Sequence, residues 1–131
     1  MLPREARMKR PADFRRTVRA GRRAGRPALT GHLLVPDAPD SMAHDGVRPG
    51  EPAKVGFIVS RAVGTAVIRN RVKRRLRALL VEYLDALPEG SLFVVRANPA
   101  AASASQADLA ADLDLVLGRL LRRQVGALHQ R

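Results

Sequence analysis

Apolar residues recur along this chain at two spacings, which separate the expected helices from the expected strands. Three segments repeat apolar positions every three to four residues, as one face of a helix does, whereas three shorter segments are nearly continuous runs of aliphatic residues. The predicted helices cover residues 11–20, 65–87 and a region beginning at Ser103 or Ser105, and the predicted strands cover 28–35, 54–60 and 91–97. This α-β-β-α-β-α order favours an α/β sandwich with one layer of helices on a small sheet.

Local signals set the boundaries of these elements. Gly21 ends the first helix, Thr65 can cap the second, and Pro88 stops it. The strands that flank the second helix form a βαβ unit, so we expect them to be parallel and the sheet to be mixed. The 131 residues fit a single domain, 1–131, with a basic tail over 1–10 and an exposed, flexible loop over 36–53.

The second predicted helix is both amphipathic and strongly basic. Ile68, Val72 and Leu76 fall in one sector of the helical wheel and can pack on the sheet. No acidic residue occurs between Pro52 and Val81. The cations that surround the apolar sector are Arg69, Arg71, Lys73, Arg74, Arg75 and Arg77. A merely solvated helix face would have compensating carboxylates one turn away, so this surface is predicted to face a polyanion.

Composition points in the same direction. The formal net charge is +12, which is typical of nucleic-acid-binding proteins. Arginine pairs with phosphate through two donors and stacks on bases, which suits irregular folded RNA. Asn70, between two arginines, could read a base edge or a 2′-hydroxyl, or could cap a local turn.

The sequence gives little support for metal binding or catalysis by the protein itself. There is no cysteine, and His32, His44 and His129 have no metal-ligand spacing, so we expect no metal site in the protein. No nucleotide-binding or hydrolase motif occurs, and no carboxylates are placed to hold catalytic metals. We therefore expect no small-molecule substrate and no cleavage by the polypeptide alone. No apolar run approaches the roughly 20 residues of a membrane span, and a cytoplasmic location is expected.

The central block of the chain is similar to a known family. Arg69-Asn70-Arg71, followed by Val72-Lys73-Arg74-Arg75-Leu76-Arg77 and preceded by Gly64-Thr65-Ala66-Val67, resembles the signature of the bacterial ribonuclease P protein subunit. The segments Asp13-Phe14, Val55-Gly56-Phe57-Ile58-Val59-Ser60 and Phe93-Val94-Val95-Arg96-Ala97 resemble other parts of the family pattern. The resemblance implies a left-handed βαβ crossover of the ribosomal protein S5 domain 2-like class.

The resemblance also implies a division of labour. The catalytic centre would lie in a large RNA subunit that uses magnesium, while the protein would bind that RNA and the 5′ leader of precursor tRNA. Carried over to this sequence, the residues facing the RNA subunit would be Arg61, Arg69, Asn70, Arg71, Lys73, Arg74 and Arg77. The leader would be bound by Phe14, Arg16, His32 and Phe57. Phe14 could instead simply dock the first helix, since both roles use the same helix face.

This chain departs from the family pattern at several positions. Val18 stands where a second aromatic residue is common, and His32 stands where the first strand often presents tyrosine. Ala62 follows Arg61 where a second basic residue is usual, and Thr65 replaces the usual asparagine. Two other functions stay open: a structural RNA-binding protein of the ribosomal type, and a DNA-binding protein that inserts a helix in the major groove.

Overall fold

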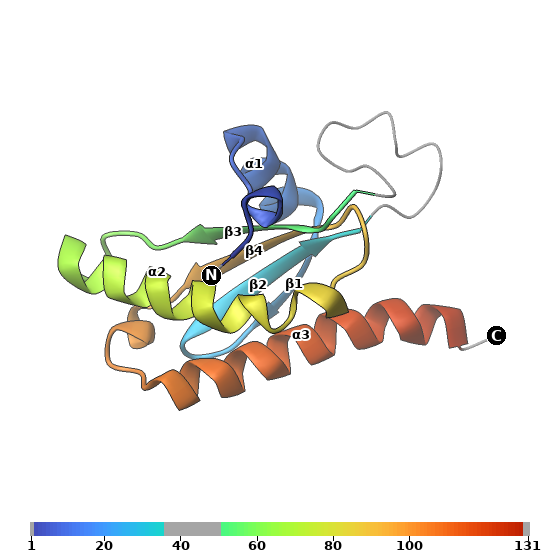
Figure 1. The fold of residues 1–131 in the computed structure, drawn as a ribbon. Coiled ribbons are helices and arrows are strands. Elements are labelled where there is room, and N and C mark those ends of the chain that lie inside the picture. Colours follow the sequence, from blue (N-terminus) through green and yellow to red (C-terminus); the bar gives the residue numbers. More distant parts are fainter. Residues whose placement is uncertain (1, 36–50, 130–131) are drawn as a thin grey trace.

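A four-stranded sheet forms the centre of the computed structural model, which describes residues 2–35 and 51–129 and their side chains as far as Leu121 (Figure 1). The strands are β1 (Arg22–Gly25), β2 (Leu29–Leu34), β3 (Lys54–Ile58) and β4 (Leu92–Ala97), in the spatial order β1-β2-β4-β3. Strands β3 and β4 are parallel, whereas the β1–β2 and β2–β4 pairs are antiparallel. The mixed sheet and the parallel pair were both predicted from the βαβ order.

Strand β1 was not predicted. It contains two adjacent arginines, and only Ala24 in it is buried. An edge strand can carry charged side chains because only one of its sides must pair with the sheet. The usual apolar alternation is therefore missing, and residues 22–26 resembled a basic connection.

Three helices pack on the sheet: α1 (Pro11–Ala20), α2 (Ala66–Val81) and α3 (Gln106–His129). The Thr65 hydroxyl accepts a hydrogen bond from the Ile68 amide at 3.4 Å, as its predicted capping role requires. The prediction that this helix reaches residue 87 was wrong. After Val81 the chain forms a short 3-10 turn, Leu84–Ala86, and Leu87 is extended because it precedes Pro88.

The helices lie on both faces of the sheet, so the prediction of a single helical layer was also wrong. Helix α1 packs on β2 and β4 from one face, whereas α2 and α3 lie on the other (Figure 1). Strand β4 explains this arrangement: Phe93 and Val95 point toward α2 and α3, and Leu92 and Val94 point toward α1. A strand that is apolar on both faces requires cover on both.

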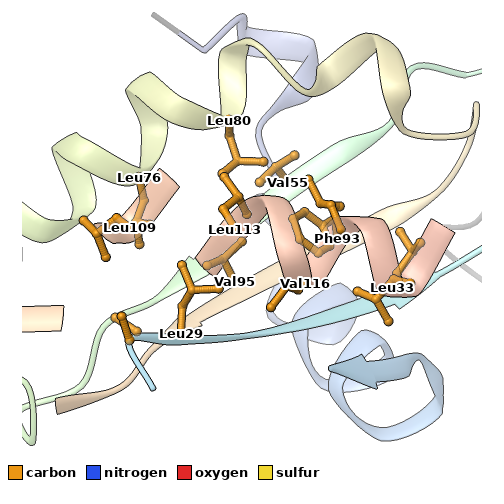
Figure 2. Close-up of a cluster of buried hydrophobic side chains, with 14 of the residues drawn as sticks. Leu29, Leu33, Val55, Leu76, Leu80, Phe93, Val95, Leu109, Leu113 and Val116 are labelled. Atoms are coloured by element: carbon orange, nitrogen blue, oxygen red, sulfur yellow. The ribbon is translucent and has the colours of Figure 1, made fainter. Parts of the chain in front are cut away.

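The larger core lies between the sheet and the pair α2 and α3 (Figure 2). Phe93 is the largest fully buried side chain and is surrounded by aliphatic residues. Leu76 and Leu80 of α2, and Leu109, Leu113 and Val116 of α3, point from their helices into this core. Their i, i+3 and i+4 spacing on each helix brings them to one side, as the sequence pattern predicted.

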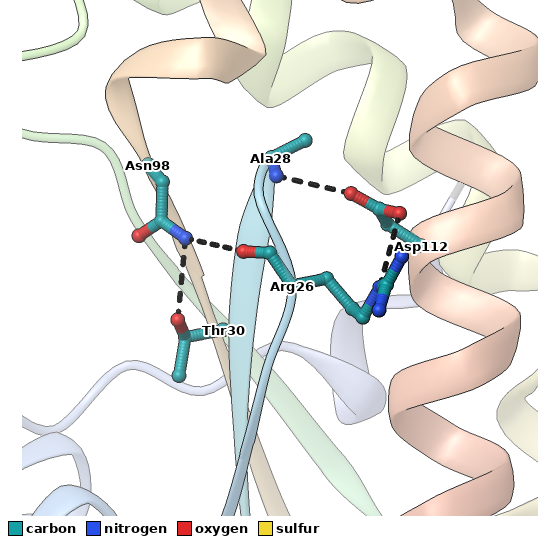
Figure 3. Close-up of polar contacts among 5 residues, drawn as sticks. All are labelled: Arg26, Ala28, Thr30, Asn98 and Asp112. Atoms are coloured by element: carbon teal, nitrogen blue, oxygen red, sulfur yellow. Dashed lines mark hydrogen bonds and ion pairs between the residues drawn. The ribbon is translucent and has the colours of Figure 1, made fainter.

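A small polar network holds the β1–β2 turn against α3 and the end of β4 (Figure 3). The Asp112 carboxylate accepts a hydrogen bond from the Ala28 amide at 3.0 Å and pairs with Arg26 Nε at 3.6 Å. Asn98 Nδ2 donates to the Arg26 carbonyl at 2.9 Å and to Thr30 Oγ1 at 3.3 Å. The network ties α3 to the β1–β2 turn and the turn to the end of β4.

The segment predicted as a basic tail is docked. It contains a 3-10 turn, η1 (Arg4–Ala6), and its Leu2, Ala6 and Met8 side chains are buried. The Met8 amide donates to the Val55 carbonyl at 2.9 Å, so the segment runs beside β3. The predicted flexible loop falls almost entirely outside the described residues.

Candidate RNA interface

The cations of α2 fall into two groups with different surroundings. On one side of the apolar stripe, Arg71 and Arg75 reach across to the connection before α3. Arg75 Nη1 donates to the Ala104 carbonyl at 3.0 Å, and Arg71 Nη2 approaches the Ala102 carbonyl at 3.5 Å. Gln106 Nε2 returns a bond to the Arg75 carbonyl at 3.3 Å. This side of the helix thus fastens α2 to α3 in addition to carrying charge.

On the other side, Arg69, Lys73 and Arg77 follow one another at intervals of one helical turn. We call these three residues the free row. None of them forms an ion pair or a side-chain hydrogen bond with the part of the chain that the structure describes. Arg77 is exposed, whereas Arg69 and Lys73 are half-buried at the margin of the apolar stripe. The free row therefore has donors available for an external anion.

The remaining predicted contacts continue this surface. Asn70 and Arg74 are exposed on the side of α2 away from the sheet, and Arg61 is exposed in the turn between β3 and α2. The Nε atom of Arg69 is buried and has no hydrogen-bond partner within the described residues. Unpartnered buried donors are uncommon in folded proteins and are often satisfied by a ligand or water. The structure thus gathers all seven predicted RNA-subunit contacts on α2 and the turn before it.

The opposite face of the sheet carries the other predicted residues. The Phe14 ring is half-buried and lies over Gly56, where a Cβ atom would collide with it. Val18 lies one turn further along α1 and packs with Leu34 and Ile58 against the same small cluster. The absence of a side chain at Gly56 thus lets the first helix approach the sheet with its aromatic ring against the backbone.

His32 lies on this same face but is only 4% exposed, so it is not an open stacking platform. Its cross-strand neighbour is Arg23, and Arg96 lies diagonally across on β4. Burial lowers the pKa of His32, and the positive charges of Arg96 and then Arg23 lower it further. Its Nδ1 atom has no partner among the described residues. His32 is therefore a buried, neutral group beneath two exposed arginines.

The structure does not bring all four predicted leader contacts together. Phe57 points to the face covered by α2 and α3, since it alternates with Gly56 and Ile58 along β3 and packs with Val55. Arg16 is half-buried on α1, with a buried Nη1 atom that has no described partner. Conversely, Arg23 and Arg96, which neighbour His32 on this face, were not predicted as leader contacts. The signal for Arg96 was its position as the one charged residue within the apolar strand 91–97.

Acidification is expected to destabilise the fold through His32. Its pKa is lower in the folded chain than in the unfolded chain, so the unfolded state binds more protons below about pH 6.5. The contribution of neutral His32 is complete above that pH and is lost as the pH falls. The melting temperature should therefore fall more steeply between pH 7.5 and 5.5 for the wild type than for His32→Gln. Parallel curves would contradict this role, and the other two histidines, present in both proteins, serve as the internal control.

The described residues contain no group of histidine and acidic side chains that could hold a metal ion. In the same part of the chain, no helix is long and apolar enough to cross a membrane. The arrangement is one of cation donors on α2 and an aromatic ring on α1, on opposite faces of the sheet, and the cations can bind a polyanion.

Comparisons with known proteins agree with this architecture. The ribonuclease P family model matches residues 2–121. The chain is 56% identical to the ribonuclease P protein component of Streptomyces bikiniensis, over 92% of this chain and 96% of that one. It is 49% identical to the one from Thermobifida fusca, over 99% and 86% of the two chains.

Solved structures of lower identity share the fold. The RNase P protein of Staphylococcus aureus superposes with a TM-score of 0.71 at 21% identity, covering 87% of this chain and 94% of that one. The protein from Thermotoga maritima gives 0.66 at 19% identity, covering 86% and 96%. The match of the family model and the close relatives are decisive: the chain belongs to the ribonuclease P protein family.

Proposed function

We propose that this chain, as the protein component of the endoribonuclease ribonuclease P, binds two RNA surfaces at once. The free row of α2, with Arg61, Asn70, Arg71 and Arg74, contacts the catalytic RNA subunit. The face of the sheet that carries α1 binds the single-stranded 5′ leader of precursor tRNA. The observation that carries this proposal is the free row, whose cations have no carboxylate partner among the described residues.

Under this proposal the chemistry is supplied by magnesium held in the RNA subunit, and the protein contributes affinity. Positive charge close to the RNA lowers the repulsion between the two negatively charged RNAs and replaces part of their counterions. The protein should then lower the magnesium concentration at which precursor binds and is cleaved. The absence of cysteine from the sequence is compatible with the reducing cytoplasm, where we expect the complex to act.

Reconstitution with the RNA subunit tests this function. At low magnesium, adding the chain should restore cleavage at the mature 5′ end and favour precursor over mature tRNA, while the chain alone should cleave neither. A purely structural RNA-binding protein would bind folded RNA but would not separate precursor from mature tRNA. A preference for duplex DNA over folded RNA in competition would instead support the groove-binding alternative.

Replacing Phe14 by alanine tests the leader surface. Stacking of a base on an aromatic ring is worth about 1–3 kcal/mol, so precursor affinity should fall about 5- to 150-fold. Affinity for the RNA subunit should stay nearly unchanged, since α1 and α2 lie on opposite faces of the sheet. Equilibrium binding of precursor and mature tRNA to the reconstituted complex measures the effect.

Val18→Ala is the matched control, because Val18 packs on the same apolar cluster as Phe14 but has no ring. Both variants should lose some thermal stability, and only Phe14→Ala should lose precursor affinity. Equal losses of precursor affinity in the two variants would mean that Phe14 acts only by docking α1.

A further inference from the structure

A cavity of about 430 Å³ opens beside the docked N-terminal segment, and no residue of the free row lines it. Its cations are Arg4, Arg7, Lys9, Arg10 and Lys54, and we call it the N-terminal cavity. None of these residues belongs to the predicted RNA contacts. Its size falls within the range of ordinary ligand sites, and its lining is too highly charged for an apolar ligand.

The cavity is built on a fixed backbone. The segment is anchored by buried Leu2, Ala6 and Met8. The Met8 amide is bonded to the Val55 carbonyl, and Arg7 Nε donates to the Leu2 carbonyl at 3.1 Å. Arg10 lies at the start of α1, where its carbonyl accepts the Asp13 amide at 3.0 Å. The backbone that carries these positive charges is therefore fixed beside the sheet, so binding orders less of the chain than it would in a free tail.

The charge balance of the cavity favours an anion. Three carboxylates, those of Glu5, Asp13 and Glu51, also line it against the five cations. Within the described chain, Arg4, Lys9 and Arg10 form no ion pair and no side-chain hydrogen bond. Asp13 is only 2% exposed, so its carboxylate presents little surface to a ligand. The exposed donors therefore exceed the exposed carboxylates, as a phosphodiester site requires.

The position along β3 identifies which RNA would reach it. Gly56, under the Phe14 ring, is two residues from Lys54 at the edge of the cavity, or about 7 Å along the strand. Both residues point to the face that carries α1, by alternation with buried Val55. Helix α2 follows the other end of β3. The order along β3 is thus the turn to α2, which carries Arg61, then Phe14, then the N-terminal cavity.

We propose that the N-terminal cavity binds phosphates of the precursor leader farther from the cleavage site than the base at Phe14. This inference rests on the proposed function, because it assumes that the leader crosses the α1 face. A strand that leaves the RNA subunit near α2 and passes Phe14 arrives next at Lys54 and Arg10. Affinity should then increase with leader length until the leader fills the cavity.

The test compares precursors with a short leader, which ends at Phe14, and a long leader, on the reconstituted complex. In Arg4→Gln/Arg10→Gln, the backbone bonds that anchor the segment remain. The variant should bind the long-leader precursor roughly tenfold more weakly, with a salt slope shallower by about 1.4, because each single-strand contact contributes about 0.7. It should bind the short-leader precursor like the wild type. The control Arg22→Gln/Arg119→Gln removes the same charge from exposed positions elsewhere and should change neither affinity.

Each other result overturns the inference. Equal loss for both leaders would mean that the cations act on the RNA subunit or by general attraction, and no loss would mean that the cavity is not an RNA site. Melting curves of the free variants establish that the segment remains folded. If the wild type itself does not prefer precursor to mature tRNA, the proposed leader binding fails first. If the wild type prefers precursor to mature tRNA and the variant binds the long leader equally well, leader binding stands and only the role of the N-terminal cavity is rejected.

Discussion

Replacing the free row by glutamine, as Arg69→Gln/Lys73→Gln/Arg77→Gln, is expected to weaken binding to the RNA subunit by roughly a thousandfold. Each charge-assisted hydrogen bond to a phosphate is worth about 1.5 kcal/mol or more, and three would be lost together. The slope of log affinity against log salt should decrease by about 3, one for each contact. Titrations of the RNA subunit with the variant at several salt concentrations measure both quantities.

Substitutions in the free row test RNA binding specifically, because these side chains contribute little to the stability of the fold. Its side chains have no described partners, so their removal should leave the melting temperature unchanged or raise it slightly by relieving repulsion. Arg19→Gln/Arg22→Gln/Arg119→Gln is the matched control, since it removes the same charge from exposed positions. A similar loss in the control would show that net charge, not the free row, sets the affinity. An unchanged salt slope would show that these side chains do not touch the RNA backbone.

Truncating Phe93 to alanine is expected to destabilise the chain by about 3–5 kcal/mol. The ring is fully buried between β4 and the pair α2 and α3, so its loss leaves a cavity bounded by three elements. Domains of this kind are stable by only about 5–15 kcal/mol, and a net charge of +12 lowers that further by self-repulsion. Urea denaturation in low-salt buffer measures the change.

Val67→Ala is the control for this experiment, because Val67 is 77% exposed on α2 and should cost little. Sulfate should restore the Phe93→Ala fold more than sodium chloride at equal ionic strength, since an anion that binds only the folded chain stabilises it by mass action. Equal effects of the two salts would indicate screening alone. A loss below about 1 kcal/mol for Phe93→Ala would mean that the core closes around the missing ring.

The helices were predictable because their signals are local. Apolar residues recur at every turn of α2, and the charged residues lie between them in the sequence. Both the buried stripe and the exposed cations could therefore be assigned from spacing alone. The strands 28–35, 54–60 and 91–97 were predictable for a similar reason, because they are short apolar runs. Strand β1 has neither property, since pairing with β2 alone makes it a strand.

The functional surface was only partly predictable. The predicted RNA-subunit contacts on α2 are close together in the chain, so the helix alone brings them onto one element. The predicted leader contacts come from α1, β2 and β3. Which of them can act together depends on the face of the sheet to which each strand side chain points. Phe57 illustrates this: its neighbours in the chain do not reveal that Gly56, and not Phe57, points to the face that carries α1.

The order of residues along the chain was enough to establish a basic amphipathic helix, its position in a βαβ unit and a charge excess that requires a polyanion. These follow from spacing within one or two turns, where geometry is the same in every fold. The burial of His32, the second helical layer and the docking of residues 2–10 required the folded molecule. They depend on contacts between segments far apart in the chain, and only the packing of the whole sheet determines which faces remain open.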